Sequence, residues 1–211
     1  MKNNKSIALD LLMLSGPLIF AQVAHISMQV IDTIMLGKLS PLALATGALG
    51  GVIIYNVAVF FVGILSSTGS LLAQAQGAND QTSAKHILTH SVLLAMLLSV
   101  VCTAIIISVP MLLPIFHLDS MLINSVSDFL RALAFGIAPW MLYFVLRDFV
   151  AVHKKSKIIL WISVLSIPLN ALLNYLFMYG KLSSALYGVT GVGLATSVVR
   201  WVMLVIVAIY I

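Results

Sequence analysis

The sequence predicts an all-α membrane protein, built as a bundle of six transmembrane helices. Of its 211 residues, 62% are hydrophobic and only 8% are charged, whereas soluble domains carry about 25% charged residues. Six apolar stretches are long enough to cross a bilayer, which takes about 20 residues in a helix. Their connections are short and turn-like, so no separate soluble domain is expected. The six stretches cover residues 11–36, 42–72, 87–113, 122–146, 158–179 and 189–211.

The first stretch carries four polar side chains on one face. It follows Lys2 and Lys5, but it is too long for a signal peptide and lacks a small-residue cleavage site, so we interpret it as a retained span. At 100° per residue, its four polar positions fall within an arc of about 80°. These positions are Gln22, His25, Gln29 and Asp32.

Such a polar stripe should face other helices or a hydrated cavity, because a charge at mid-bilayer costs roughly 2.5 to 3.5 kcal/mol on insertion scales. Gln22 and Gln29 are compatible with a substrate cavity or with simple hydrogen bonds between helices. His25 fits the cavity too, or a bond to one carbonyl. Asp32 is either hydrated near the outer interface or a coupling site, where a carboxylate exchanges a proton for a cation. The short Asp side chain reaches the interface poorly, which favours coupling.

The second, third and fourth stretches offer no catalytic or metal-binding pattern. The second ends in a polar segment, residues 67–80, typical of a capped and hydrated helix end. The third contains the single cysteine, Cys102, which excludes a disulfide framework. Four further histidines lack the spacing and the partners of a metal site. No Ser-His-Asp order, phosphate loop or paired carboxylate occurs, so we expect neither an enzyme nor a bound cofactor.

The fifth and sixth stretches carry the remaining candidate site residues. Asn170 and Asn174 are four residues apart, just after Pro168, and therefore share one helix face. They could bind a cation or a polar ligand, or only hydrogen-bond neighbouring helices. In the sixth stretch, three glycines at residues 188, 191 and 193 favour close packing, and Thr196 adds a hydroxyl.

The distribution of basic residues predicts the orientation of the bundle. Seven Lys and Arg residues lie on the side of the amino terminus and two on the other, and the richer side is normally cytoplasmic. Six spans then place both termini in the cytoplasm. The net charge of +5 lacks a basic stripe interleaved with aromatics, so no nucleic-acid partner is expected. The seven are Lys2, Lys5, Lys85, Arg147, Lys154, Lys155 and Lys157, and the two are Lys38 and Lys181.

Four segments together resemble the multidrug and toxic compound extrusion (MATE) family, most closely its NorM-like bacterial branch. They occur in the family's order and span nearly the whole chain. The segments are "SGPLIFAQVAHISMQVIDTIMLGKLSPLALA" (15–45), "LLAQAQGA" (71–78), "IPLNALLNYLFMYG" (167–180) and "GVTGVGLAT" (188–196).

The resemblance implies a multi-pass antiporter of the bacterial inner membrane that exports cationic amphipathic xenobiotics in exchange for protons or sodium ions. Asp32 falls on the family's acidic position in the first helix. Asn170, Asn174 and Thr196 fall on its other cation-coupling positions. Some relatives carry Asp where Asn174 stands, so Asn174 removes one possible titrating group. His25 stands where Gln is expected, which either adds a second titrating group or has no consequence.

Family members have twelve helices in two lobes, and residues 1–211 match only the amino-terminal six-helix lobe. We therefore expect a transporter half that needs a second six-helix lobe to enclose a cavity. Two alternatives stay open. One is a flippase for lipid-linked precursors, which would favour a cationic cavity, and Arg131 and Arg200 are the only cations this chain offers for it. The other is a scaffold or a non-functional membrane fragment.

Overall fold

Every regular element of the structure is a helix. The computed structural model describes residues 4–153, 155–181 and 187–211, and within these ranges it contains no strand. The elements are α1 (Asn4–Leu39), α2 (Pro41–Leu65), α3 (Ser67–Gly77), α4 (Gln81–Ser108), the short 3-10 helices η1 (Val109–Met111) and η2 (Leu113–Phe116), α5 (Ser120–Ala134), α6 (Ile137–Val152), α7 (Ser156–Met178) and α8 (Val189–Tyr210).

The helices confirm the expected bundle and correct one of its spans. Five spans are long and apolar enough to cross a membrane, and one of them consists of α2 and α3 together. A sixth forms only if α5 and α6 are taken as one span with a 42° bend. The stretch 122–146, expected as a single helix, is therefore two helices that meet at residues 135–136.

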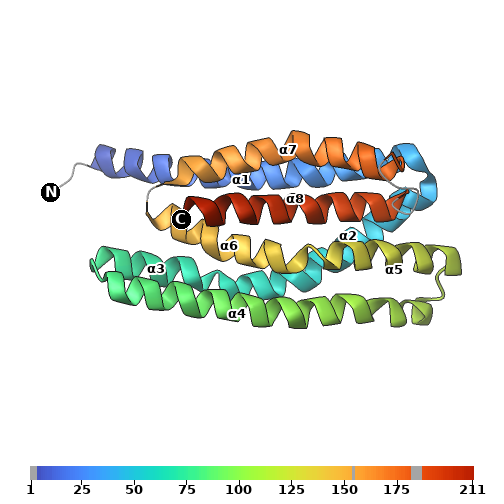
Figure 1. Ribbon diagram of the computed structural model, residues 1–211, viewed down its shortest axis with the longest axis horizontal. Coiled ribbons are helices and arrows are strands. Elements are labelled where there is room, and N and C mark those ends of the chain that lie inside the picture. Colours follow the sequence, from blue (N-terminus) through green and yellow to red (C-terminus); the bar gives the residue numbers. More distant parts are fainter. Residues whose placement is uncertain (1–3, 154, 182–186) are drawn as a thin grey trace.

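Helix α8 lies at the centre of the bundle, between α7 on one side and α5 and α6 on the other (Figure 1). Helix α1 packs along α7, and α3 and α4 form the opposite layer. The start of α1 and the end of α8 lie at the same end of the bundle (Figure 1). This is the arrangement expected for an even number of spans.

The interior combines apolar side chains with small and polar residues, and many further large apolar side chains point outward. In a bilayer, close packing and interhelical hydrogen bonds replace the hydrophobic effect as the force between helices. Thr46 Oγ1 accordingly donates to Ser125 Oγ at 2.9 Å between α2 and α5. Thr68 Oγ1 donates to Ser91 Oγ at 3.0 Å between α3 and α4. The exposed leucines, isoleucines and phenylalanines suit contact with lipid.

The break between α5 and α6 is stabilised by α8. Gly136 approaches α8 so closely that an added methyl group would lie 2.9 Å from the Cα of Ser197. The Ser197 hydroxyl donates to the Ala132 carbonyl at 2.7 Å, and the Trp201 indole donates to the Phe135 carbonyl at 3.2 Å. Carbonyls at the end of a helix lack intrahelical partners. These two donors therefore supply hydrogen bonds to carbonyls that the end of α5 leaves without partners in the helix.

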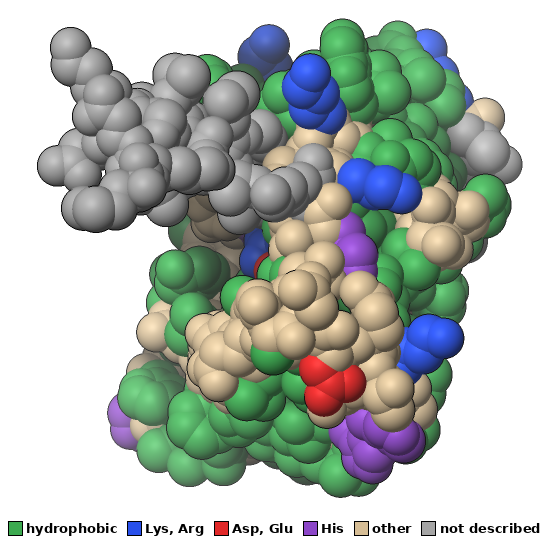
Figure 2. Space-filling model, turned by 90° about the vertical axis from the view of Figure 1, so that its left-hand side faces the viewer, with side chains coloured by type: hydrophobic (Ala, Val, Ile, Leu, Met, Phe, Trp, Pro, Cys, Tyr) green, Lys and Arg blue, Asp and Glu red, His purple; other side chains and the backbone are tan. Residues whose placement is uncertain are grey.

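One end of the bundle is richer in basic side chains. Figure 2 looks onto the end where α1 begins and shows more Lys and Arg than acidic side chains there. Lys85 lies near the start of α4, and Lys155 and Lys157 lie at the start of α7, all at this end. Lys38 lies in the last turn of α1 and Lys181 follows α7, both at the other end. Arg147, expected in the fourth connection, lies instead within α6. Lys2 and Lys154 lie outside the described residues. The described lysines at the helix ends therefore lie on the sides that the sequence predicted, whereas Arg147 does not belong to a connection.

Candidate functional site

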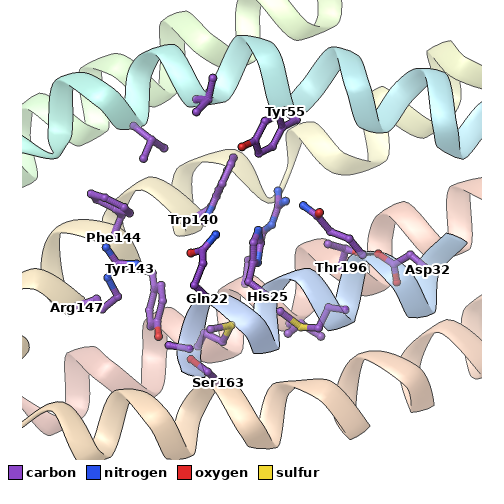
Figure 3. Close-up of a pocket in the computed structure, with 18 residues that line it drawn as sticks. Gln22, His25, Asp32, Tyr55, Trp140, Tyr143, Phe144, Arg147, Ser163 and Thr196 are labelled. Carbon is purple, nitrogen blue, oxygen red and sulfur yellow. Dashed lines mark hydrogen bonds between the residues drawn. The ribbon is translucent and has the colours of Figure 1, made fainter. Parts of the chain in front are cut away.

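A pocket opens between α1, α2, α6, α7 and α8 (Figure 3). Asp32 and Thr196 lie at one end of it, Phe144 and Arg147 at the other, and Trp140 lies between them (Figure 3). Aromatic and apolar side chains supply most of the wall surface, and eight of the eighteen lining residues are polar or charged. A concave, mostly apolar space with a few placed polar groups is typical of a small-molecule site.

The polar stripe of α1 faces this pocket. All four of its residues, Gln22, His25, Gln29 and Asp32, line the pocket wall. Gln22 and Gln29 are exposed, whereas His25 and Asp32 are partly buried. The helical periodicity thus predicted correctly that one face of the first helix borders a cavity.

Asp32 is bound by side chains from two other helices. Asn174 of α7 donates its Nδ2 to Asp32 Oδ1 at 2.5 Å, and Thr196 of α8 donates its Oγ1 to Asp32 Oδ2 at 3.0 Å. Each carboxylate oxygen therefore has a donor. Because both bonds join residues more than 140 positions apart, the carboxylate links α1 to α7 and α8.

Behind the carboxylate, two fully buried amides are only partly satisfied. Asn174 Nδ2 also donates to Asn170 Oδ1 at 3.3 Å, as their spacing along α7 allows. Asn174 Oδ1 and Asn170 Nδ2 are buried with no hydrogen-bond partner. Buried polar atoms are rarely left unpaired. These two amide atoms could therefore form additional hydrogen bonds if either side-chain amide rotated. The four residues predicted for cation coupling, Asp32, Asn170, Asn174 and Thr196, thus meet in one cluster.

The aromatic wall of the pocket was not predicted from the sequence. Trp140, Tyr143 and Phe144 of α6 line it, together with Tyr55 of α2. The imidazole of His25 stacks on the Trp140 ring, with centroids 6.0 Å apart and planes inclined by 23°. The helical spacing of the α6 residues was a detectable signal, because positions three and four apart share one face.

Two arginines line the pocket, and they differ in their ion pairs and hydrogen bonds. Arg147 pairs with Asp148, Nη2 to Oδ1, at 2.9 Å and lies over the Phe144 ring at 4.2 Å. Arg200 lies over Trp140, with 4.7 Å between its Cζ and the ring centroid. Its Nε and Nη1 are buried and have no hydrogen-bond partner. Arg131, the other cation expected within a span, is exposed and does not line the pocket.

The histidines outside the pocket form no metal site in the part of the chain that the structure describes. His86 and His90 are adjacent, with ring centroids 6.3 Å apart, but no third ligand joins them. His90 Nδ1 and His153 Nδ1 instead lie within hydrogen-bond distance of backbone carbonyls one helical turn earlier.

The chain is similar in sequence to bacterial multidrug resistance proteins. A protein of Pseudomonas aeruginosa named "Probable multidrug resistance protein NorM" is 33% identical over 201 residues, which are 95% of this chain and 41% of that protein. The "Multidrug resistance protein NorM" of Vibrio cholerae is 28% identical over 211 residues, which are 100% of this chain and 46% of that protein. The chain thus spans less than half the length of these relatives.

Solved transporter structures share the fold. One is described as the outward-facing conformation of a multidrug resistance MATE family transporter of the MOP superfamily. It superposes with a TM-score of 0.85 and 22% identity, over 94% of this chain and 44% of that one. A MOP superfamily transporter from Pyrococcus furiosus gives a TM-score of 0.84 over 94% of this chain and 43% of that one, also at 22% identity. The six-helix bundle is therefore equivalent to one lobe of such a transporter.

The sequence profile of the MatE family matches residues 17–176. This range contains α2 to α6 entirely, most of α1 and α7, and every residue of the site described above except those of α8. The chain belongs to the MatE family.

Proposed function

We propose that residues 1–211 form the amino-terminal lobe of a multidrug efflux antiporter, which exports cationic amphipathic compounds in exchange for protons or sodium ions. The observation that carries this proposal is the position of Asp32. Its carboxylate lines the pocket and is bound on both oxygens by Asn174 and Thr196. The pocket thus combines a space for an organic molecule with a group that can take up a cation.

The two unpaired amide atoms support a coupling role for this cluster. Asn174 Nδ2 faces the carboxylate, as suits an ionised Asp32, while its Oδ1 has no donor. A protonated carboxyl can donate to an amide oxygen, and a sodium ion prefers oxygen ligands. Rotation of the Asn174 side-chain amide by 180° would place its Oδ1 toward Asp32, where it could accept from a protonated carboxyl or bind a sodium ion. We propose that this exchange of partners accompanies uptake and release of the coupling ion.

The aromatic wall supports a cationic amphipathic substrate. Trp, Tyr and Phe faces attract organic cations through the ring quadrupole and bury apolar surface at the same time. Trp140, Tyr143 and Tyr55 all contribute to the pocket. A flippase for lipid-linked precursors is less well supported, because it calls for a cluster of free cations, and Arg147 is already paired with Asp148.

The test is efflux of ethidium from a pump-deficient bacterial host. The chain is expressed alone and joined to a second six-helix lobe, since we expect the second lobe to be needed to enclose the cavity. Asp32→Asn should reduce efflux by the joined protein at least tenfold without reducing the amount of protein in the membrane. Asp128→Asn is the matched control, because Asp128 is exposed on α5, pairs with Arg131 and does not line the pocket; it should leave efflux unchanged.

Two results would contradict the proposal. Efflux at the wild-type rate in the Asp32→Asn protein would remove the coupling role of this residue. Absence of efflux in both forms of the wild-type protein, with normal membrane insertion, would favour the scaffold or non-functional fragment considered above.

A further inference from the structure

A row of buried polar side chains runs along α7, from the Asp32 cluster toward the end of the bundle where α1 begins (Figure 1). At 100° per residue its five positions fall within an arc of about 80°, so they share one helix face. Each residue is at most 3% exposed. We call the following residues the α7 polar row: Ser156, Ser163, Ser166, Asn170 and Asn174.

Unpaired polar atoms are concentrated at the α7 polar row. Of the seven buried side-chain nitrogen and oxygen atoms without a hydrogen-bond partner among the described residues, three belong to it, namely Asn174 Oδ1, Asn170 Nδ2 and Ser156 Oγ. A fourth is the hydroxyl of Tyr143 on α6, which points toward Ser163 (Figure 3). Buried polar atoms normally bind a protein group or an ordered water, and a buried water needs two or more polar partners. The row supplies such partners along its length.

The spacing of the row suits single waters between neighbouring groups. At a rise of about 1.5 Å per residue, Ser166 lies about 4.5 Å along the helix from Ser163, and Asn170 lies about 6 Å from Ser166. A water that makes two hydrogen bonds of about 2.8 Å joins groups about 5.6 Å apart. Only the step from Ser163 to Ser156, about 10 Å along the helix, needs more than one water.

One end of the row is bound to Asp32, and most of the row lies outside the pocket. Asn174 donates its Nδ2 to Asp32 Oδ1 and also to Asn170 Oδ1. Ser166, Asn170 and Asn174 do not line the pocket, whereas Ser163 does. The row therefore offers Asp32 a connection that is largely separate from the space for a substrate.

The chemistry of the row favours a proton over a sodium ion. No charged residue occurs in α7 after Lys157, so the row offers only neutral hydroxyls and amides. Polar groups in the interior of a membrane bundle mark ion pathways and proton relays. Waters and hydroxyls pass protons on by exchanging hydrogen bonds, whereas a sodium ion needs several oxygen ligands at every step, which a single file of side chains does not provide.

We infer that the α7 polar row is a water-bridged path along which protons pass between Asp32 and the end of the bundle where α1 begins. This inference rests on the proposed function and deepens it, since it names the proton as the coupling ion and gives its route. The Asp32 carboxyl releases its proton to the first water, each water passes one proton on, and one proton leaves at Ser156. The carboxylate that remains accepts the bonds from Asn174 and Thr196.

The experiment measures hydrogen–deuterium exchange of a thiol placed in the row, with the full chain in lipid nanodiscs. Ser166→Cys supplies the thiol, whose infrared S–H stretching band is lost as deuterium from heavy water replaces its proton. Ser99→Cys is the matched control on α4, because Ser99 is also 3% exposed and its Oγ also donates at 2.7 Å to the carbonyl three residues earlier. Both variants carry Cys102→Ala, so that each contains one thiol. The thiol at position 166 should exchange at least tenfold faster than the one at position 99.

A second measurement does not depend on the thiol. In the protein joined to a second lobe, Ser166→Ala should lower the maximal rate of ethidium efflux in sodium-free medium at least threefold. The half-saturating ethidium concentration should stay unchanged, because Ser166 does not line the pocket. Ser99→Ala should change neither quantity.

Equal exchange rates of the two thiols would overturn the inference, because burial alone would then explain both. An unchanged maximal rate in Ser166→Ala, or efflux that stops when sodium is removed, would overturn it as well. Thiol exchange requires neither a substrate nor an ion gradient, so a failure there is separate from a failure of the Asp32-dependent efflux test.

Discussion

At the scale of single residues, the pocket contains two charged groups in opposite circumstances. Asp32 is bound by an amide and a hydroxyl from two helices. Arg200 lies over Trp140 and next to Gly136, and no ion pair joins it to an acidic side chain among the described residues. The two charged groups of one pocket therefore differ in how many hydrogen bonds the described side chains give them. The coupling role proposed for Asp32 rests on this difference.

A third charged residue, Asp80, gives a pH-dependent prediction outside the membrane. It caps α4 by accepting bonds from the Ser83 hydroxyl at 2.7 Å and the Ser83 amide at 2.9 Å. These bonds lower the pKa of Asp80 below its usual range. A lowered folded pKa stabilises the cap above the unfolded value of about 3.9, and this stabilisation is lost as the pH falls through the folded value.

We therefore expect hydrogen-exchange protection of the Ser83 amide to decrease below about pH 4. Asp80→Asn should keep a cap that does not titrate, because Asn is an equally good N-cap residue. Its protection factor should stay flat over the same range. An identical pH dependence in both proteins would show that another group is responsible.

The sequence predicted the α1 side of the pocket but not the α6 side. The stripe from Gln22 to Asp32 interrupts an apolar helix, so periodicity alone reveals it. Trp140 and Tyr143 could equally face lipid, because their helical spacing shows that they share one face but not which way that face points. The packing of α6 against α8 places this face toward the pocket. The sequence also could not reveal that Arg200 Nε and Nη1 have no hydrogen-bond partner. That depends on which side chains of the neighbouring helices lie beside the guanidinium.

At the scale of elements, the bent span of α5 and α6 is the main departure from the expected topology. Its cause lies in α8, where Ser197 and Trp201 bind carbonyls near the break. Gly136 in an apolar run gives no local sign of a bend, because a helix tolerates one glycine at a cost of about 1 kcal/mol. The contact with a helix some 60 residues later decides the geometry.

We predict that Gly136→Ala destabilises the bundle by about 1–3 kcal/mol, the usual cost of overpacking a filled interior. The added methyl group would lie 2.7 Å from Ser197 Oγ and 2.9 Å from its Cα, which belongs to the backbone and cannot simply turn away. Thermal unfolding in detergent measures the loss. Gly51→Ala is the matched control, since no atom lies within 4 Å of its added methyl group. Equal melting temperatures for both variants would contradict the prediction.

At the scale of the whole molecule, the charged connections divide between the two ends of the bundle. We propose that the end with Lys85, Lys155 and Lys157 faces the cytoplasm, following the excess of basic residues there. The single cysteine, Cys102, is fully buried. Introduced cysteines can therefore be labelled in intact cells against a low background.

Lys38→Cys should react with a membrane-impermeant maleimide in intact cells, because Lys38 is exposed in the last turn of α1, at the end proposed to face outward. Lys85→Cys should react only after the membrane is permeabilised. The unmodified chain serves as the blank for Cys102. Reversed labelling of the two variants would reverse the proposed orientation.

The close approach of Gly136 to Arg200 has a consequence for how the sequence at the bend could change over evolutionary time. Gly136 does not line the pocket, yet a methyl group added to it would lie 3.1 Å from Arg200 Cδ. A larger residue at position 136 would therefore displace a side chain of the pocket without bordering the pocket itself. The bend between α5 and α6 is in this sense a remote determinant of the shape of the pocket.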